Sequence, residues 1–146
     1  MKKQISRTIT GLAATLLLAF VVNAHVSHAV VLRVPFDFVA GERQMPAGRY
    51  TVRRIRSDAE SALLIRSEDG RSTAVVLTNS GEPAPRGAAF VFRQHGDRYF
   101  LAEVSMPGTA SVRELPKSSA ERRIERELAE QQDGESKSVT VFGNIQ

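Results

Sequence analysis

Hydrophobic and polar residues alternate along most of the chain after residue 30, with the period of two that is typical of β-strands. In residues 32–38 the apolar side chains stand at every even position. Pro46-Ala47-Gly48 then predicts a turn, because proline and glycine favour the backbone angles of tight turns. Arg49 to Arg56 follows as the next predicted strand.

Further short strands are predicted where alternating runs lie between turn residues. They cover residues 62–67, 73–78, 88–94, 99–105 and 110–115. The turn at Glu68 to Arg71 contains Asp-Gly, a strong hairpin signal when two strands flank it. The turn at His95 to Arg98 predicts a second hairpin. Asn79 to Gly87 is rich in glycine and proline and is predicted to be an exposed connection.

The pattern changes to a helical one near the C-terminus. Ser118 to Glu121 fits a capping box, in which the serine oxygen accepts the third helical N–H and the glutamate returns to the cap residue. Apolar side chains then recur every fourth residue from Ala120 to Leu128. We predict a helix at about 118–132, ended by Asp133-Gly134. Ser138 to Phe142 alternates again and is predicted to be a final edge strand.

Residues 1–29 have a different pattern, that of a secretory signal peptide. Lys2, Lys3 and Arg7 precede an apolar run of residues 12–22, and small residues offer cleavage after Ala24 or Ala29. The run is shorter than the roughly 20 residues that a membrane-spanning helix needs. We therefore expect an exported protein, periplasmic or secreted, whose mature chain is soluble and has no transmembrane segment.

Charge and cysteine content narrow the function further. Three of the 20 cationic side chains lie in the signal and the 16 anionic ones lie beyond it, so the mature chain is close to neutral despite the pI of about 10.0. Such a chain lacks the basic surface that nucleic-acid binding requires. Cysteine is absent, so burial rather than disulfides must stabilise the fold.

Short strands at this spacing predict a mainly β fold, either an antiparallel β-sandwich or a small barrel, with one C-terminal α-helix. We expect residues 30–146 to form a single β-rich domain. The predicted core takes its side chains from most of the predicted strands and one from the helix. It comprises Phe36, Phe38, Tyr50, Leu63 or Leu64, Val75 or Val76, Phe90, Phe92, Leu101 and Ile124.

The sequence predicts no catalytic residue, no metal site and no cofactor. His95 is the only histidine after the signal, and its place in a hairpin turn favours a solvated imidazole without a role. Without cysteine, a zinc site or a nucleophilic triad would depend on this one histidine. Carboxylates near strand ends leave one enzymatic alternative, in which two of them act as acid and base. They are Asp37, Glu42, Asp97 and Glu103.

Two features are candidates for ligand or partner binding. The first is the cluster Arg49, Arg53, Arg54 and Arg56, which the period of two divides between the faces of one strand. The alternative without a binding role is a solvated strand whose charged side chains prevent pairing with a strand of another molecule. The second is the loop at residues 81–87 with Pro83 and Pro85, which is either a partner-binding loop or an ordinary connection.

Several segments resemble a family of small exported proteins from environmental bacteria that has no assigned activity. The resemblance spans most of residues 31–130. It rests on Val34 to Phe38 (VPFDF), Pro46 to Val52 (PAGRYTV), Leu63 to Ser67 (LLIRS) with Asp69-Gly70-Arg71, Ala74 to Thr78, Gly96 to Leu101 and Arg113 to Pro116. It implies export and a compact β-rich domain, and it supplies no site residues.

The expected function is that of an exported, non-enzymatic binding or structural module of the cell envelope. Its partner would be an envelope protein, or a small apolar ligand held in an enlarged core cavity. One alternative is a carboxylate-based hydrolase of envelope polysaccharide. Another is an inhibitor or partner of an exported protein that binds through residues 79–87.

Overall fold

The structure is a computed structural model that describes residues 29–56, 59–83, 87–130 and 136–145. The predicted signal peptide up to His28, Pro85 and the predicted helix end at Asp133-Gly134 lie outside the described residues. The elements are β1 (Val30–Val34), β2 (Phe38–Ala40), β3 (Arg43–Met45), β4 (Gly48–Arg56), β5 (Ala59–Ser67), β6 (Thr73–Leu77), β7 (Asn79–Pro83), β8 (Ala88–His95), β9 (Arg98–Ser105), β10 (Ser111–Glu114), α1 (Ser119–Glu130) and β11 (Lys137–Ile145).

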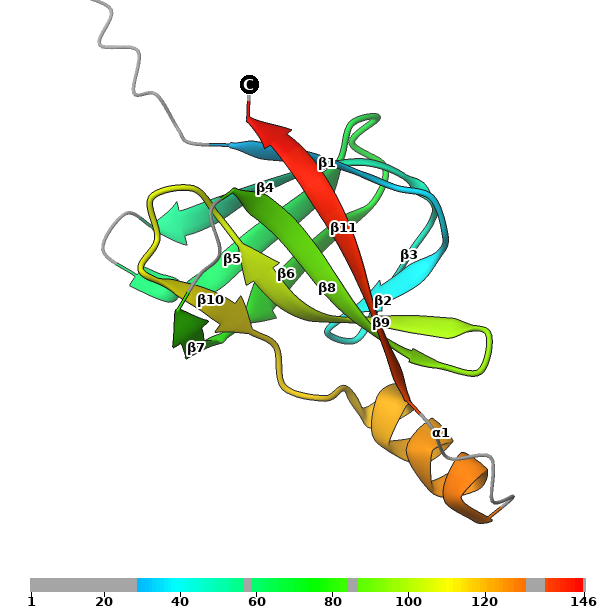
Figure 1. Ribbon diagram of the computed structural model, residues 1–146. Coiled ribbons are helices and arrows are strands. Elements are labelled where there is room, and N and C mark those ends of the chain that lie inside the picture. Colours follow the sequence, from blue (N-terminus) through cyan, green and yellow to red (C-terminus); the bar gives the residue numbers. More distant parts are fainter. Residues whose placement is uncertain (1–28, 57–58, 84–86, 131–135, 146) are drawn as a thin grey trace, which may run out of the picture.

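The strands of the described residues form one strongly bent sheet, whose halves face each other as the layers of a sandwich (Figure 1). The strand order is β3-β2-β9-β8-β11-β1-β4-β5-β6, and β10 and β7 continue the sheet beside the second half of β9. Neighbouring strands are antiparallel except β2 and β9. Among the described strands the sheet does not close into a barrel, since β3 and β6 end the order. The predicted mainly β sandwich with one helix near the C-terminus is confirmed.

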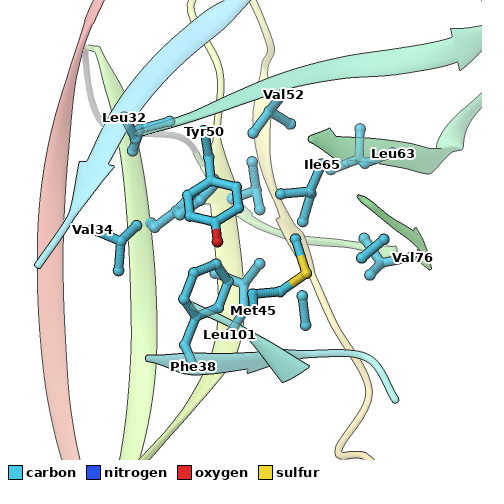
Figure 2. Close-up of a cluster of buried hydrophobic side chains, with 14 of the residues drawn as sticks. Leu32, Val34, Phe38, Met45, Tyr50, Val52, Leu63, Ile65, Val76 and Leu101 are labelled. Atoms are coloured by element: carbon cyan, nitrogen blue, oxygen red, sulfur yellow. The ribbon is translucent and has the colours of Figure 1, made fainter. Parts of the chain in front are cut away.

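The core fills the space between the layers with side chains from alternate positions of the strands. Figure 2 shows the ring of Tyr50 near its centre, with Phe38 below it. These two rings meet edge to face with their centroids 5.1 Å apart, a favourable aromatic geometry. The Tyr50 hydroxyl donates a hydrogen bond to the Pro46 carbonyl, so its polar atom is satisfied. Burial raises the pKa of Tyr50 to about 12.

The structure resolves the two pairs that alternation left open. Leu63 and Val76 are buried in the core, whereas Leu64 and Val75 lie on the outer face of the same strands. The strand predicted over residues 32–38 is two strands, because the chain bends at Phe36, between the end of β1 at Val34 and the start of β2 at Phe38. The alternation of burial nevertheless continues across the bend.

Two predictions about strands near sheet edges were wrong. Asn79 to Pro83 is not a simple connection but strand β7, which pairs with β10. Glycine and proline are tolerated there because β7 pairs with a neighbour on one side only. The final strand β11 is not an edge strand either, since it lies between β8 and β1 and pairs with both. Its period of two was visible in the sequence, but its place in the sheet was not.

Helix α1 extends from one end of the sandwich, beside the start of β11 (Figure 1). Ser118 caps it, since its hydroxyl accepts the backbone N–H of Glu121 at 3.1 Å, as predicted. The second cap interaction comes from Glu42 in the β2–β3 turn, whose carboxylate accepts the backbone N–H and the hydroxyl of Ser119. No helix in the described part of the chain has the length and apolar composition needed to cross a membrane.

Candidate functional site

The arginines predicted as a binding cluster are distributed along β4. Arg49 and Arg53 point to the outer face, and Arg49 pairs with Glu68 at 3.3 Å. Arg54 is exposed beside an irregularity in the pairing of β4 with β5, between Arg54 and Arg56. Strand β4 lies between β1 and β5, so its charges do not serve to protect a sheet edge. Pro83 is exposed at the end of β7.

A surface of mixed apolar and polar side chains lies on the outer side of β4, β5 and β6, and we call it the β4–β6 face. The strand register places Thr51, Arg53, Ala62, Leu64, Arg66, Thr73, Val75 and Leu77 on it, and the exposed Ile55 lies at the pairing irregularity that follows on β4. Leu77 is 70% exposed, Val75 61% and Ile55 43%. The strand register aligns Arg53, Leu64 and Val75 in one row across the three strands. Apolar side chains therefore gather at the β6 side, with arginines beside them.

A hollow of about 320 Å³ lies on the same face, over β4 and β5. All but one of its lining residues are polar or charged, namely Thr51, Arg53, Arg66, Ser67 and Glu68, and the exception is Leu64. Small-molecule sites are usually lined predominantly by apolar side chains. This hollow is therefore better suited to polar and charged groups of a larger partner than to a buried apolar ligand.

A second site was missed by the sequence analysis and lies between the β8–β9 hairpin and helix α1. His95 is only 4% exposed, so the prediction of a solvated imidazole was wrong. Its Nε2 lies 3.1 Å from Oε1 of Glu121 and 3.5 Å from Oε1 of Glu125. Phe100 packs edge-on against the imidazole. The physical reason for the burial is that α1 covers the end of the hairpin, which no local pattern in residues 95–98 reveals.

Glu121 is the most deeply buried charged group of this site, with 1% of its surface exposed. Arg93 binds its carboxylate through two hydrogen bonds, from Nε at 2.5 Å and from Nη2 at 3.1 Å. Burial alone would raise the pKa of Glu121, but the hydrogen bonds and charge of Arg93, with a contribution from His95, hold it below the usual range. Glu121 was predicted to fold back onto the helix cap, and the structure directs it to Arg93 and His95 instead.

Glu125 lies one helical turn after Glu121 and is partly exposed. Lys117 approaches its Oε1 at 2.5 Å. A pocket of about 190 Å³ opens beside these groups, lined by His95, Glu125, Leu128, Ala129 and Ser136. One ligand atom each from His95, Glu121 and Glu125 lies within 4.8 Å of the others, which is close enough for the three side chains to hold a metal ion.

The carboxylates suggested for acid and base catalysis have other partners or positions. Asp37 accepts the backbone N–H of Ala47 at 2.7 Å. Glu42 binds Ser119 at the start of α1, and these hydrogen bonds lower its pKa. Asp97 is exposed in the β8–β9 turn, and Glu103 lies on β9 opposite Val91. Among the described residues, Glu121 and Glu125 do lie close to each other, and their spacing of four on a predicted helix was the available signal.

Comparison of the chain with protein-family models, with curated proteins and with solved structures returned no match. The functional argument therefore rests on the two sites described above.

Proposed function

We propose that this chain is an exported, non-enzymatic binding module of the cell envelope, and that it holds an extended polypeptide against the β4–β6 face. The observation that carries the proposal is the exposure of Val75 and Leu77 on strand β6. This strand is at one end of the strand order and pairs only with β5 among the described strands. Large apolar side chains on an edge strand are a usual feature of partner-binding surfaces.

Strand β6 lacks the features with which proteins protect sheet edges. Thr73 to Leu77 contains neither a charged residue nor a proline, whereas exposed edges usually carry one or the other. An extended segment is able to add to such an edge through main-chain hydrogen bonds, while its side chains select the partner. On this face Val75 and Leu77 would contact apolar side chains of the added segment. Parts of the partner that extend over β5 and β4 would meet Arg66 and Arg53, which favour acidic side chains.

The arrangement of the carboxylates supports binding over hydrolysis. Glu121 and Glu125 approach each other closely, but Glu121 is buried and held by Arg93 through both oxygens. A glycosidase needs both carboxyl groups to reach the scissile bond from a cleft. Glu121 does not line the adjacent pocket, which argues against the hydrolase alternative.

The arrangement of β7 favours the β4–β6 face over residues 79–87 as the binding surface. Strand β7 pairs with β10, and the buried Arg113 binds Thr78 and Ser80 at its base. A segment anchored in this way has less freedom to adapt to a partner than an unpaired strand edge. The predicted loop-mediated inhibitor is therefore not the function that we propose.

Site-specific cross-linking in the source cells tests the proposal. A photo-reactive residue at Leu77 is expected to give a discrete heterologous adduct, while the same residue at Thr140, exposed on β11, gives none. The purified partner should then bind the wild-type chain and lose about tenfold or more in affinity with Val75→Lys, because an apolar contact is removed and a charge introduced. Thr140→Lys is the matched control and should bind like the wild type.

Two outcomes would overturn this proposal. Equal labelling from Leu77 and Thr140 would show that the β4–β6 face does not select a partner. An adduct of two copies of this chain would assign the face to self-association instead. Export is tested on the same cells, where the protein from the periplasmic or culture fraction should begin after Ala24 or Ala29.

A further inference from the structure

His95, Glu121 and Glu125 form a compact group of metal-ligating side chains, which we call the His95 cluster. They come from two elements that pack against each other, the end of β8 and the first two turns of α1. His95 and Glu121 are buried, and Glu125 is partly exposed. We propose that the His95 cluster binds a divalent transition metal ion, with Zn²⁺ as the best match.

The separations between the ligand atoms are close to those around zinc. Zinc–ligand bonds of about 2.0–2.2 Å in a tetrahedron place neighbouring ligand atoms about 3.3–3.6 Å apart. The observed separations from His95 Nε2 are 3.1 Å to Glu121 and 3.5 Å to Glu125. The two carboxylate ligand atoms are at most 4.8 Å apart, and rotation of the partly exposed Glu125 side chain brings them closer.

The ligand types also favour a transition metal. Imidazole nitrogen is a common ligand of zinc, whereas calcium and magnesium prefer sites built from oxygen. Three protein ligands leave a fourth position for water. The pocket beside His95 and Glu125, about 190 Å³ in volume, supplies room for that water and a route of entry for the ion.

Two cations of the protein already contact the cluster and set the expected affinity. Arg93 binds Glu121 through both carboxylate oxygens, which orients that ligand but also opposes a second positive charge. Lys117 contacts Glu125 and is 46% exposed, so its ammonium group is able to move into water. The metal ion would replace the Lys117 ammonium group as the partner of Glu125. It would also replace the proton of the hydrogen bond between His95 and Glu121. We therefore expect a binding site of moderate affinity.

Isothermal titration of the untagged mature chain with ZnCl₂, after treatment with a chelator, tests the inference. The expected result is one ion per chain, and titration with Co²⁺ should give the visible absorption of a tetrahedral complex. His95→Gln and Glu125→Gln should each weaken zinc binding by about tenfold or more, because even the partners of ligands typically contribute 10–100-fold. Glu127→Gln, on the same helix but outside the cluster, is the matched control.

Lys117→Met distinguishes a metal site from a network of ion pairs that merely fixes the helix. If zinc displaces Lys117 from Glu125, removing the lysine should strengthen binding a few-fold. Circular dichroism of each variant would show that α1 is retained. Substoichiometric binding, or an affinity that His95→Gln leaves unchanged, would overturn the inference. So would a Lys117→Met variant that binds zinc no better than the wild type.

Discussion

Replacement of Glu121 by glutamine tests how α1 is held to the sandwich. Glu121→Gln keeps the size of the side chain but removes the charge that Arg93 and His95 face. Removing one partner of a buried ion pair costs about 3–5 kcal/mol, because the other charge stays desolvated. Arg93 is partly exposed and recovers some hydration, so we expect a smaller loss, about 2–3 kcal/mol.

This loss should appear as local opening of α1 rather than as global unfolding. Ile124 is the only apolar side chain of the helix that is buried, and burial of one such residue contributes about 1.5–3 kcal/mol. The free energy that docks the helix is therefore only a few kcal/mol, similar in size to the expected loss. The strands do not depend on this contact, because they are held by pairing within the sheet and by the core between its two layers.

Hydrogen exchange of the metal-free protein in EDTA measures the effect directly. The amides of α1 should lose protection by about 30- to 150-fold in Glu121→Gln, since each 1.4 kcal/mol is a factor of ten. The amides of β4 and β5 should keep theirs. Glu127→Gln is the control, because Glu127 pairs with Arg123 at 3.9 Å on the exposed face, where a pair contributes at most about 1 kcal/mol. Protection of α1 within twofold of the wild type would refute this account.

Three further predictions concern the sandwich itself. Gly143→Ala should destabilise the fold by about 1–3 kcal/mol in urea unfolding. A Cβ at this position would lie 2.7 Å from Cγ of Leu32 and 3.0 Å from the Val31 carbonyl oxygen. A change below about 0.5 kcal/mol would contradict the packing described. Gly70→Ala should cost about 1–2 kcal/mol, because φ is +71° at this residue, and Gly70→Asn should cost less in the same assay. Tyr50 has a raised pKa of about 12, so its contribution to stability is complete below pH 10 and is lost as the pH rises through 12. A spectroscopic titration in which Tyr50 ionises near pH 10 would disprove this prediction.

Local patterns sufficed for much of the fold. The period of two showed that only one residue of each pair, Leu63 or Leu64 and Val75 or Val76, faces the core. Which residue is buried depends on which face of the sheet packs against the other layer. The hairpin at Asp69-Gly70 was predictable because the backbone angle that this turn needs belongs to glycine. In each case the information lies within a few neighbouring residues.

The site could not be predicted in the same way, because its groups come from distant parts of the chain. His95 is separated from Glu121 by 26 positions, and nothing near His95 indicates that a helix will cover it. Alternation showed that β11 is a strand, but its pairing with β1 and β8 depends on which strands remain unpaired after the rest of the sheet has formed. Long-range pairing of this kind leaves no local trace.

The central position of β11 has a consequence for the order of folding. Strand β11 follows all the other described strands in the sequence and separates β8 from β1, so neither of these neighbours is fully paired until residues 137–145 are available. Contacts between sequence-distant strands also form slowly, because a long loop must close before they stabilise the structure. We therefore expect the sandwich to stay open until residues 137–145 have been synthesised. We propose that the protein is exported, and for such a protein this delay would keep the chain unfolded until it has crossed the membrane.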